Sequence, residues 1–378
     1  MPGEYSISSG SSYSSSDNDR ELGEDSDEEV LLIDHSQCSS SDEDVVEEEK
    51  NCDDNNFGPW EEYGEETYFE DLDPPFRRKY KCRGLLSGLN EPIDFFNLFI
   101  SDELLEDVCE KSDKYYKKYK NNTRLAKRTH KKKWNKPDLV EIRGFLGLLL
   151  SMGILKKPKL DDYWTTNPLF QTPGFGEIMS RDHFKSILRC FIFYDIENID
   201  HYDRLYKIRS FIDHIVLTSR TLYEPEQHLT IDESMIKFNG RSRLKVYMPS
   251  KPIKFGFKVY LMTDASNSYV LNWILHEGPN ESLVSLTQRI TEAYENRGFI
   301  VFMDRYYTTI DVIKDLSDRG FGVFAAIQQN RIHGNKKMKE SFKRLGEGES
   351  KFYLYENQKI LLTCWRDSKV VQITKSWR

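Results

Sequence analysis

The chain has 378 residues, of which 38% are hydrophobic and 31% are charged, so it can bury the core of one large domain or two ordinary ones. Its six cysteines form no C-x-x-C or C-x-x-H pair and no regular framework, which argues against a zinc module and against disulfides. The sequence has no signal-peptide pattern and no apolar run of bilayer length, so we expect an intracellular protein that enters no membrane.

The formal net charge of −8 is unevenly distributed along the chain. Residues 1–74 hold 25 Asp and Glu and two basic residues, whereas residues 75–378 hold 52 Lys and Arg and 37 Asp and Glu. We expect residues 1–74 to be a disordered acidic tail. Such a tail on a basic body is common in nucleic-acid proteins, and a tail that only keeps the body soluble is an equally good interpretation. Ser26, Ser40 and Ser41 each have an acidic residue three positions later, the pattern favoured by acid-directed kinases.

Residues 75–225 are expected to form a helical region. Apolar residues recur there at helical spacing, and Ser101 and Ser180 stand where N-caps are expected. The segment 137–155 is apolar nearly all round, which predicts a buried helix. The expected helices cover residues 92–99, 102–118, 137–155, 180–195 and 204–223.

The stretch 111–136 is strongly basic, with 12 Lys and Arg and one acidic residue. Three tyrosines and Trp134 lie between the cations, and aromatic faces among cations suit a nucleic-acid backbone. A solvated helix end followed by a loop is the plainer interpretation, and both stay open. The piece KRTHKKK at 127–133 also fits a nuclear localisation signal. The candidate DNA-binding residues in it are Lys127, Arg128, Lys131, Lys132 and Lys133.

From residue 226 onward the pattern changes from helices to strands. β-Branched and aromatic residues predict five strands, and helical patterns precede and follow the fourth of them. Three strands, a helix, a strand, a helix and a strand is the order of the ribonuclease-H-like α/β fold, in which the first and fourth strands are neighbours. We therefore assign residues 226–330 to such a core. The expected strands cover residues 228–238, 254–265, 268–278, 298–304 and 322–330, and the helices 281–296 and 308–319.

Two aspartates stand at strand positions where a carboxylate is costly unless it is paired or binds a metal. Asp232 lies inside the first predicted strand, and Asp304 ends the fourth. If these strands are neighbours, the two carboxylates converge on a site for Mg²⁺ or Mn²⁺, ions that activate water and stabilise the leaving oxygen of a phosphodiester. Two strand-end aspartates that cap turns are the structural alternative, which the pattern alone leaves open.

Three blocks of the sequence resemble the piggyBac transposases, segment after segment and in order. They read DDYWTTNPLFQTPGFGEIMSRDHFKSILRCFIFYD, LTIDESMIKFNGRSRLKVYMPSKPIKFGFKVYLMTDA and VFMDRYYTTIDVIKDLSDRG, and the resemblance extends over about residues 91–375. It implies that Asp232 and Asp304 are the first two catalytic aspartates of a ribonuclease-H-like core interrupted by a β-rich insertion, which begins within residues 331–378. The family's third aspartate has no counterpart in this chain, and Asp367 lies in an insertion strand and is not that residue.

The resemblance also implies a function, which is metal-dependent cutting and joining of DNA at TTAA sites. It implies a nuclear homodimer that recognises terminal inverted repeats, with Mg²⁺ or Mn²⁺ as cofactor and residues 75–225 serving dimerisation and DNA binding. A face of Lys251, Lys254 and Lys258 is expected to contact DNA. Without the third aspartate we expect this chain to be inactive or a fragment, because two carboxylates compensate two divalent ions poorly. The alternative is a domesticated, non-catalytic DNA-binding or chromatin-interaction protein.

Overall fold

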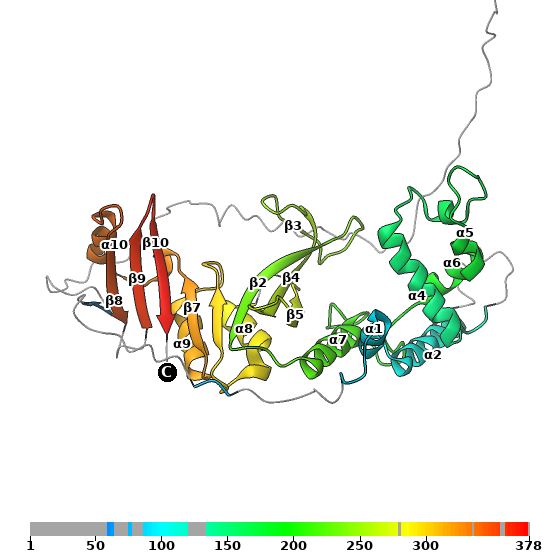
Figure 1. The fold of residues 1–378 in the computed structure, drawn as a ribbon, viewed down its shortest axis with the longest axis horizontal. Coiled ribbons are helices and arrows are strands. Elements are labelled where there is room, and N and C mark those ends of the chain that lie inside the picture. Colours follow the sequence, from blue (N-terminus) through cyan, green and yellow to red (C-terminus); the bar gives the residue numbers. More distant parts are fainter. Residues whose placement is uncertain are drawn as a thin grey trace, which may run out of the picture.

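The computed structural model describes residues 59–63, 75–77, 86–119, 134–278, 281–334, 336–355 and 360–376. Figure 1 shows two parts, with helices gathered around α4 at one end and a long sheet with its own helices at the other. One helix connects the two parts, because α7 (Arg209–Leu222) contacts both α1 (Pro92–Phe99) and strand β5 (Val270–Leu275). The mixed α/β architecture that the sequence predicts is confirmed.

The helical part has a hydrophobic core of its own. Its elements are α1, α2 (Asp102–Tyr119), α4 (Leu139–Ile154), η2 (Leu160–Trp164), α5 (Pro173–Ile178) and α6 (Arg181–Cys190). Asp138 caps α4, since its carboxylate accepts the N–H of Glu141 at 2.8 Å while the Glu141 carboxylate accepts the N–H of Asp138. Phe145 of α4 and Phe184 of α6 pack in the core with ring centroids 4.9 Å apart.

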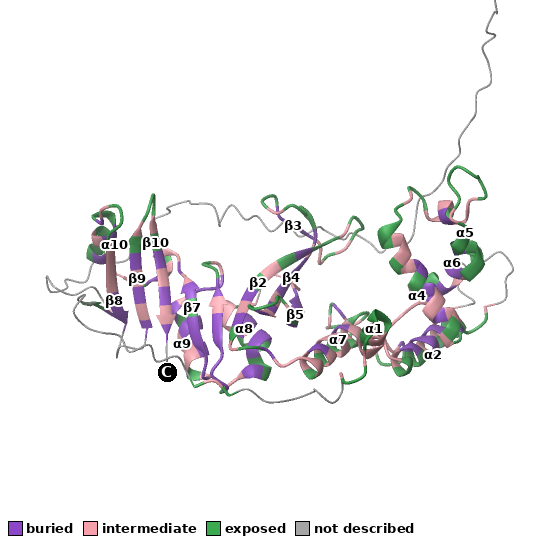
Figure 2. Cartoon of the chain, viewed as in Figure 1, coloured by how far each residue is buried: buried purple, intermediate pink, exposed green. Residues whose placement is uncertain are grey.

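Helix α4 is not buried all round, so that part of the sequence prediction is wrong. Ile142, Phe145 and Leu148 face the core, but Val140 is 79% exposed and Ile154 is 85% exposed. Within the described residues the neighbouring helices cover one side of α4, and the apolar residues of its other side face solvent, as Figure 2 shows at the end of the helix.

The second part is a single ten-stranded sheet with the order β1-β8-β9-β10-β7-β6-β2-β4-β3, and β5 also pairs with β4. Strands β6 and β7 continue parallel from β2, whereas β4 is antiparallel to β2. The expected adjacency of the first and fourth strands is therefore confirmed as the pair β2 and β6. The further strands are β1 (Trp60–Tyr63), β2 (His228–Lys237), β3 (Val246–Tyr247), β4 (Phe255–Asp264), β6 (Ile300–Met303), β7 (Gly322–Ala326), β8 (Ser350–Tyr355), β9 (Ile360–Arg366) and β10 (Val370–Ser376).

Helices cover the sheet and complete its core. They are α8 (Leu283–Thr291), η3 (Glu292–Tyr294), α9 (Ile310–Asp318), η4 (Gln329–Arg331) and α10 (Lys336–Lys343). Helices α8 and α9 pack against each other, and α10 inserts Met338 and Phe342 into the core beside Tyr353 of β8. Of the helices in the part of the chain that the structure describes, none combines the length and apolar character needed to cross a bilayer.

Strand β1 was not expected, because its residues fall within the segment assigned to the acidic tail. The structure pairs it antiparallel with β8, with Trp60 opposite Tyr355. The Trp60 side chain is 1% exposed, and its indole N–H donates to the carbonyl of Ile332 at 2.7 Å. The folded body therefore includes part of the segment 1–74, and the prediction of a disordered acidic tail for residues 1–58 lies outside the described residues.

Candidate metal and nucleic-acid site

The two predicted aspartates lie where the pairing of two adjacent parallel strands ends, with Asp232 in the middle of β2 and Asp304 directly after β6. In the pairing of β2 with β6, Ile231 stands opposite Met303, and Asp232 and Asp304 follow one residue later on each strand. Paired strands lie about 4.8 Å apart, so the register brings the backbones of the two aspartates side by side. Both side chains are exposed, which leaves the carboxylates open to solvent and to an approaching ligand.

Hydrogen bonds hold the backbone around both carboxylates. One oxygen of Asp232 accepts the N–H of Glu233 at 2.8 Å, and one oxygen of Asp304 accepts the N–H of Tyr306 at 2.7 Å. The loop after Asp304 is also fixed from outside, since the guanidinium of Arg331 donates to the carbonyl of Tyr306 at 2.6 Å and to that of Arg305 at 3.2 Å. Arg331 thus orients the loop that carries the second aspartate, a role the sequence did not reveal.

Glu233 is directed away from this pair and into a buried contact. Its carboxylate accepts the hydroxyl of the fully buried Tyr307 at 2.7 Å and pairs with the ammonium of Lys251 at 2.9 Å. Burial would raise the pKa of Glu233, but the hydrogen bonds from Lys251 and Tyr307 outweigh it and lower the pKa. The ion pair raises the pKa of Lys251, and the charges of Asp232 and Asp304 contribute to the same shift, so Lys251 stands beside the aspartate pair as a cation.

The expected DNA-contacting face of three lysines is only partly present. Lys254 is exposed and Lys251 is half-buried, but Lys258 is 2% exposed, so the prediction that it faces DNA is wrong. Its ammonium lies over the rings of Tyr306 at 4.5 Å and Tyr260 at 4.9 Å. The reason is strand alternation, which places position 258 on the core side of β4.

The carboxylate pair fits a hard divalent cation. Mg²⁺ is typically held by one or two carboxylates together with water and substrate phosphates, which is the donor set that Asp232 and Asp304 offer. Among the residues that the structure describes, no group of three or more His, Cys, Asp and Glu side chains could hold a metal. Within the described residues the two aspartates are thus not part of a larger protein cage for a metal.

The basic stretch 111–136 is described only at its two ends, and its five candidate residues from Lys127 to Lys133 lie outside the described residues. At the described ends, Lys117 pairs with Asp113 at 2.6 Å, and Trp134 donates its indole N–H to Asp113 at 3.0 Å.

Other cations and rings of this stretch are also engaged within the protein. Lys111 donates to the carbonyl of Phe193 at 3.0 Å, and Lys118 donates to that of Ile196 at 2.9 Å. Tyr116 stacks on Trp134 with ring centroids 5.0 Å apart. These aromatic faces pack on one another, which favours the structural interpretation for this end of the stretch.

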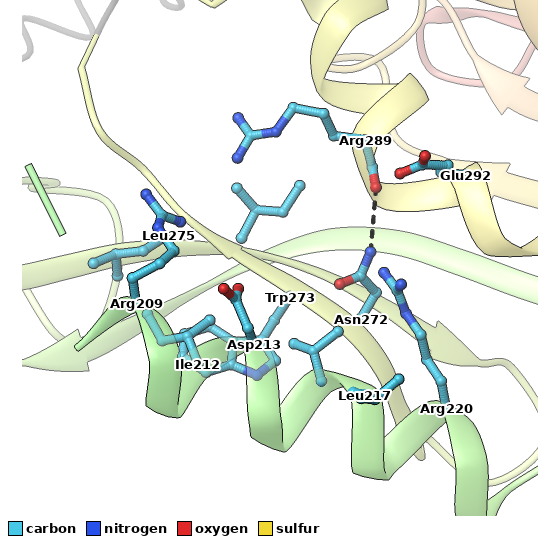
Figure 3. A pocket seen from close by; sticks show the side chains of 12 residues that line it. Arg209, Ile212, Asp213, Leu217, Arg220, Asn272, Trp273, Leu275, Arg289 and Glu292 are labelled. Atoms are coloured by element: carbon cyan, nitrogen blue, oxygen red, sulfur yellow. Dashed lines mark hydrogen bonds between the residues drawn. The ribbon is translucent and has the colours of Figure 1, made fainter. Parts of the chain in front are cut away.

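A separate pocket lies between α7, β5 and α8. Figure 3 shows Arg209, Arg220 and Arg289 around it, with Asp213 and Glu292 also on its walls. Neither of the predicted metal ligands lines the pocket. Because cations and carboxylates are mixed in its lining, the pocket indicates no class of ligand.

Comparison with known proteins identifies the family. A family model described as Transposase IS4 matches residues 91–376 of this chain. The human PiggyBac transposable element-derived protein 2 is 23% identical over 294 residues, which make up 75% of this chain and 48% of the relative. This chain belongs to the piggyBac transposase family. The resemblance that the three sequence blocks indicate is thus confirmed.

Two further relatives define the extent of the match. The human PiggyBac transposable element-derived protein 3 is 22% identical over 76% of this chain and 48% of its own length. A piggyBac transposase solved in a synaptic complex with hairpin DNA has a TM-score of 0.62 at 21% identity and is matched over 77% of this chain and 62% of its own. The piggyBac-family chain therefore spans about half the length of these human relatives, and the likeness to the solved structure establishes the fold.

This piggyBac-family chain has one more buried carboxylate, which sequence analysis missed. Asp264 at the end of β4 is 0% exposed and accepts four hydrogen bonds. One oxygen accepts the Tyr223 hydroxyl and the Glu226 N–H, both at 2.8 Å. The other accepts the Ser266 N–H at 2.8 Å and its hydroxyl at 2.6 Å. Asp264 therefore joins the end of α7, the entry to β2 and the turn between β4 and β5.

Proposed function

We propose that this chain is a DNA-binding protein of cut-and-paste transposase descent, in which Asp232 and Asp304 hold a divalent cation, Mg²⁺ or Mn²⁺. The observation that carries the proposal is the register of β2 with β6, which sets the two aspartates side by side. The neighbouring strand order β5-β4-β2-β6-β7, with β4 antiparallel and the others of the core parallel to β2, supports a ribonuclease-H-like core.

The residues around the pair support a phosphodiester as the ligand. A divalent cation held there supplies Lewis acidity toward a phosphate oxygen. Lys251, held by Glu233 beside the two carboxylates, provides a positive charge for a second phosphate oxygen. Arg331 keeps the Asp304 loop in place, so the carboxylate is oriented before a ligand arrives.

The partners follow from the same proposal. A solved relative is a synaptic complex with hairpin DNA, which supports DNA as the ligand class. We extend the proposal to recognition of terminal inverted repeats and TTAA targets, to a homodimer and to a nuclear location. The two carboxylates in the described residues favour weak metal binding, on the order of 10⁻³ M, over the tight binding of a complete site.

Metal binding tests the aspartate pair directly. Titration of the full chain with Mn²⁺, followed by electron paramagnetic resonance of free ion, is expected to show one weak site. Asp232→Asn and Asp304→Asn should each weaken it by about tenfold or more, a change of about 1.4 kcal/mol, because each removes one anionic ligand. Asp367→Asn is the matched control and should leave the affinity unchanged, because Asp367 is an exposed carboxylate in the turn between β9 and β10, not in a strand as the sequence predicted. Equal affinity in all four proteins would refute the site.

DNA binding tests the second half of the proposal. The full chain should bind duplex DNA weakly, and log K should fall against log salt with a slope of roughly −4, because phosphate neutralisation supplies most of the energy. Removal of residues 1–58 should tighten binding, since eighteen acidic residues no longer compete with phosphates. The control is the full-length chain with residues 42–54 neutralised to Asn and Gln, which should behave like the deletion. An affinity that is flat with salt and insensitive to both changes would contradict the proposal.

A further inference from the structure

Helix α10 presents a row of cations to solvent. Lys336, Lys339 and Lys343 are exposed and recur at positions i, i+3 and i+7, so they share one face of the helix. The opposite face is anchored, because Met338 is 0% and Phe342 is 2% exposed in the core. The row is thus a rigidly mounted basic surface, and the aspartate pair does not use it.

Strand β1 lies close to the segment that leads into this helix. The indole of Trp60 bonds to the carbonyl of Ile332 at 2.7 Å, and Ile332 precedes the first residue of α10 by four positions. Glu62 of the same strand pairs with Lys351 of β8 at 2.8 Å. The first described residues, Pro59 and Trp60, therefore lie near the segment that leads into α10.

The length and charge of that preceding chain match the helix. Residues 42–54 hold eight Asp and Glu and one Lys, whereas α10 holds four Lys and one Glu. Five residues lie between Asp54 and Trp60, and the six steps from one to the other can span up to about 20 Å when extended. Helix α10, with 8 residues, is about 12 Å long. The acidic segment can therefore lie along the whole basic row without any change in the body.

We infer that the exposed basic face of α10 is the docking site of the acidic segment 42–54 of the same chain. Docked there, the segment covers the lysines of α10, and a polyanion must displace it to reach them. Phosphate groups on Ser40 and Ser41, which adjoin the segment, strengthen the contact because each adds negative charge within reach of the helix. The inference is independent of the metal site and of the proposed function.

Lysine reactivity in the full chain tests the contact. The chain is treated briefly with an acetylating reagent, and each lysine is quantified by mass spectrometry in two proteins, the native chain and the chain with residues 42–54 neutralised to Asn and Gln. A segment that occupies α10 about nine-tenths of the time lowers the reactivity of its lysines about tenfold. We expect Lys336, Lys339 and Lys343 to react slowly in the native chain. Their reactivity should rise when residues 42–54 are neutralised, or when about 0.5 M salt is added to screen the charges.

The controls lie in the same molecule. Lys156 and Lys237 are exposed lysines outside β1, α10 and the strands beside them, and their reactivity should be the same in both proteins. Equal reactivity of the α10 lysines in the two proteins, or an equal change at all lysines, would overturn the inference. Zero-length carbodiimide coupling should join acidic residues of 42–54 to α10 in the full chain, and coupling mainly to lysines of α2 would also overturn it. Neither measurement involves DNA or metal. Both therefore test the docking contact even if the proposed DNA and metal binding are refuted.

Discussion

Replacing Asp264 with alanine is expected to lower the free energy of unfolding by about 3–5 kcal/mol, the largest effect of any single carboxylate in the sheet. Asp264 is fully buried and accepts hydrogen bonds from Tyr223, Glu226 and Ser266, so its removal leaves four donors without their acceptor. Chemical denaturation followed by circular dichroism measures the change. The exposed Asp318, replaced with alanine, is the matched control and should change stability by no more than about 0.5 kcal/mol.

The same residue gives a prediction for pH. Burial would raise the pKa of Asp264, but the hydrogen bonds from Ser266, the Glu226 N–H and Tyr223 outweigh it and lower the pKa. A carboxyl whose pKa is lower in the folded state than the unfolded value of about 3.9 stabilises the fold above that value, and this contribution is lost as pH falls through the folded pKa. The stability difference between the native chain and Asp264→Asn should therefore shrink below about pH 4. A difference that stays constant down to pH 2.5 would show that the charge is not the cause.

Removal of the first 74 residues is expected to destabilise the fold, whereas removal of the first 58 is not. The longer deletion takes away Trp60, whose buried indole packs on Tyr355 with ring centroids 4.8 Å apart and bonds to Ile332. Loss of a buried Trp side chain typically costs about 3–5 kcal/mol, so Trp60→Ala in the full chain should reproduce most of the effect. Thermal unfolding of the three proteins beside the native chain measures it.

A conservative variant separates packing from hydrogen bonding at this position. Trp60→Phe keeps an aromatic ring but leaves the carbonyl of Ile332 without its donor, and a loss of about 1–3 kcal/mol is expected. If the folded body began only at residue 75, as composition alone suggests, removal of the first 58 and of the first 74 residues would leave the same stability. That outcome would mean that β1 contributes nothing to the fold.

The local sequence pattern was sufficient to predict two of the helices and the strands that carry the two aspartates. The helices expected at 92–99 and 102–118 are found within one residue of those bounds, because their capping residues and apolar spacing are local signals. The pairing of β2 with β6 followed from the order of strands and helices, and it places Asp232 and Asp304 as expected. Their role as metal ligands stays a prediction.

Other features depend on contacts between distant residues, which a local pattern does not carry. Strand β1 lies among acidic residues and gains its structure from β8, almost 300 positions away. The misplacement of Lys258 could have been avoided, because Tyr260, Met262 and Asp264 follow it at every second position and form the core side of β4. The same alternation predicts that Asp264 is buried. A single polar residue at the end of a strand is, however, equally typical of a turn, so the pattern alone does not decide.

The four residues of β1 also form one edge strand of the sheet. The next strand is β8, with the sequence SKFYLY. If β1 were absent, β8 would be the edge strand, and its backbone N–H and C=O groups on that side would be unpaired beside aromatic residues. Glu61 and Glu62 in β1 are exposed and place negative charge on this edge of the sheet, which discourages a second chain from adding a strand. Truncation beyond residue 63 should therefore promote aggregation through β8. Oligomers that form only after such truncation report strand addition there and are no measure of the homodimer that we propose.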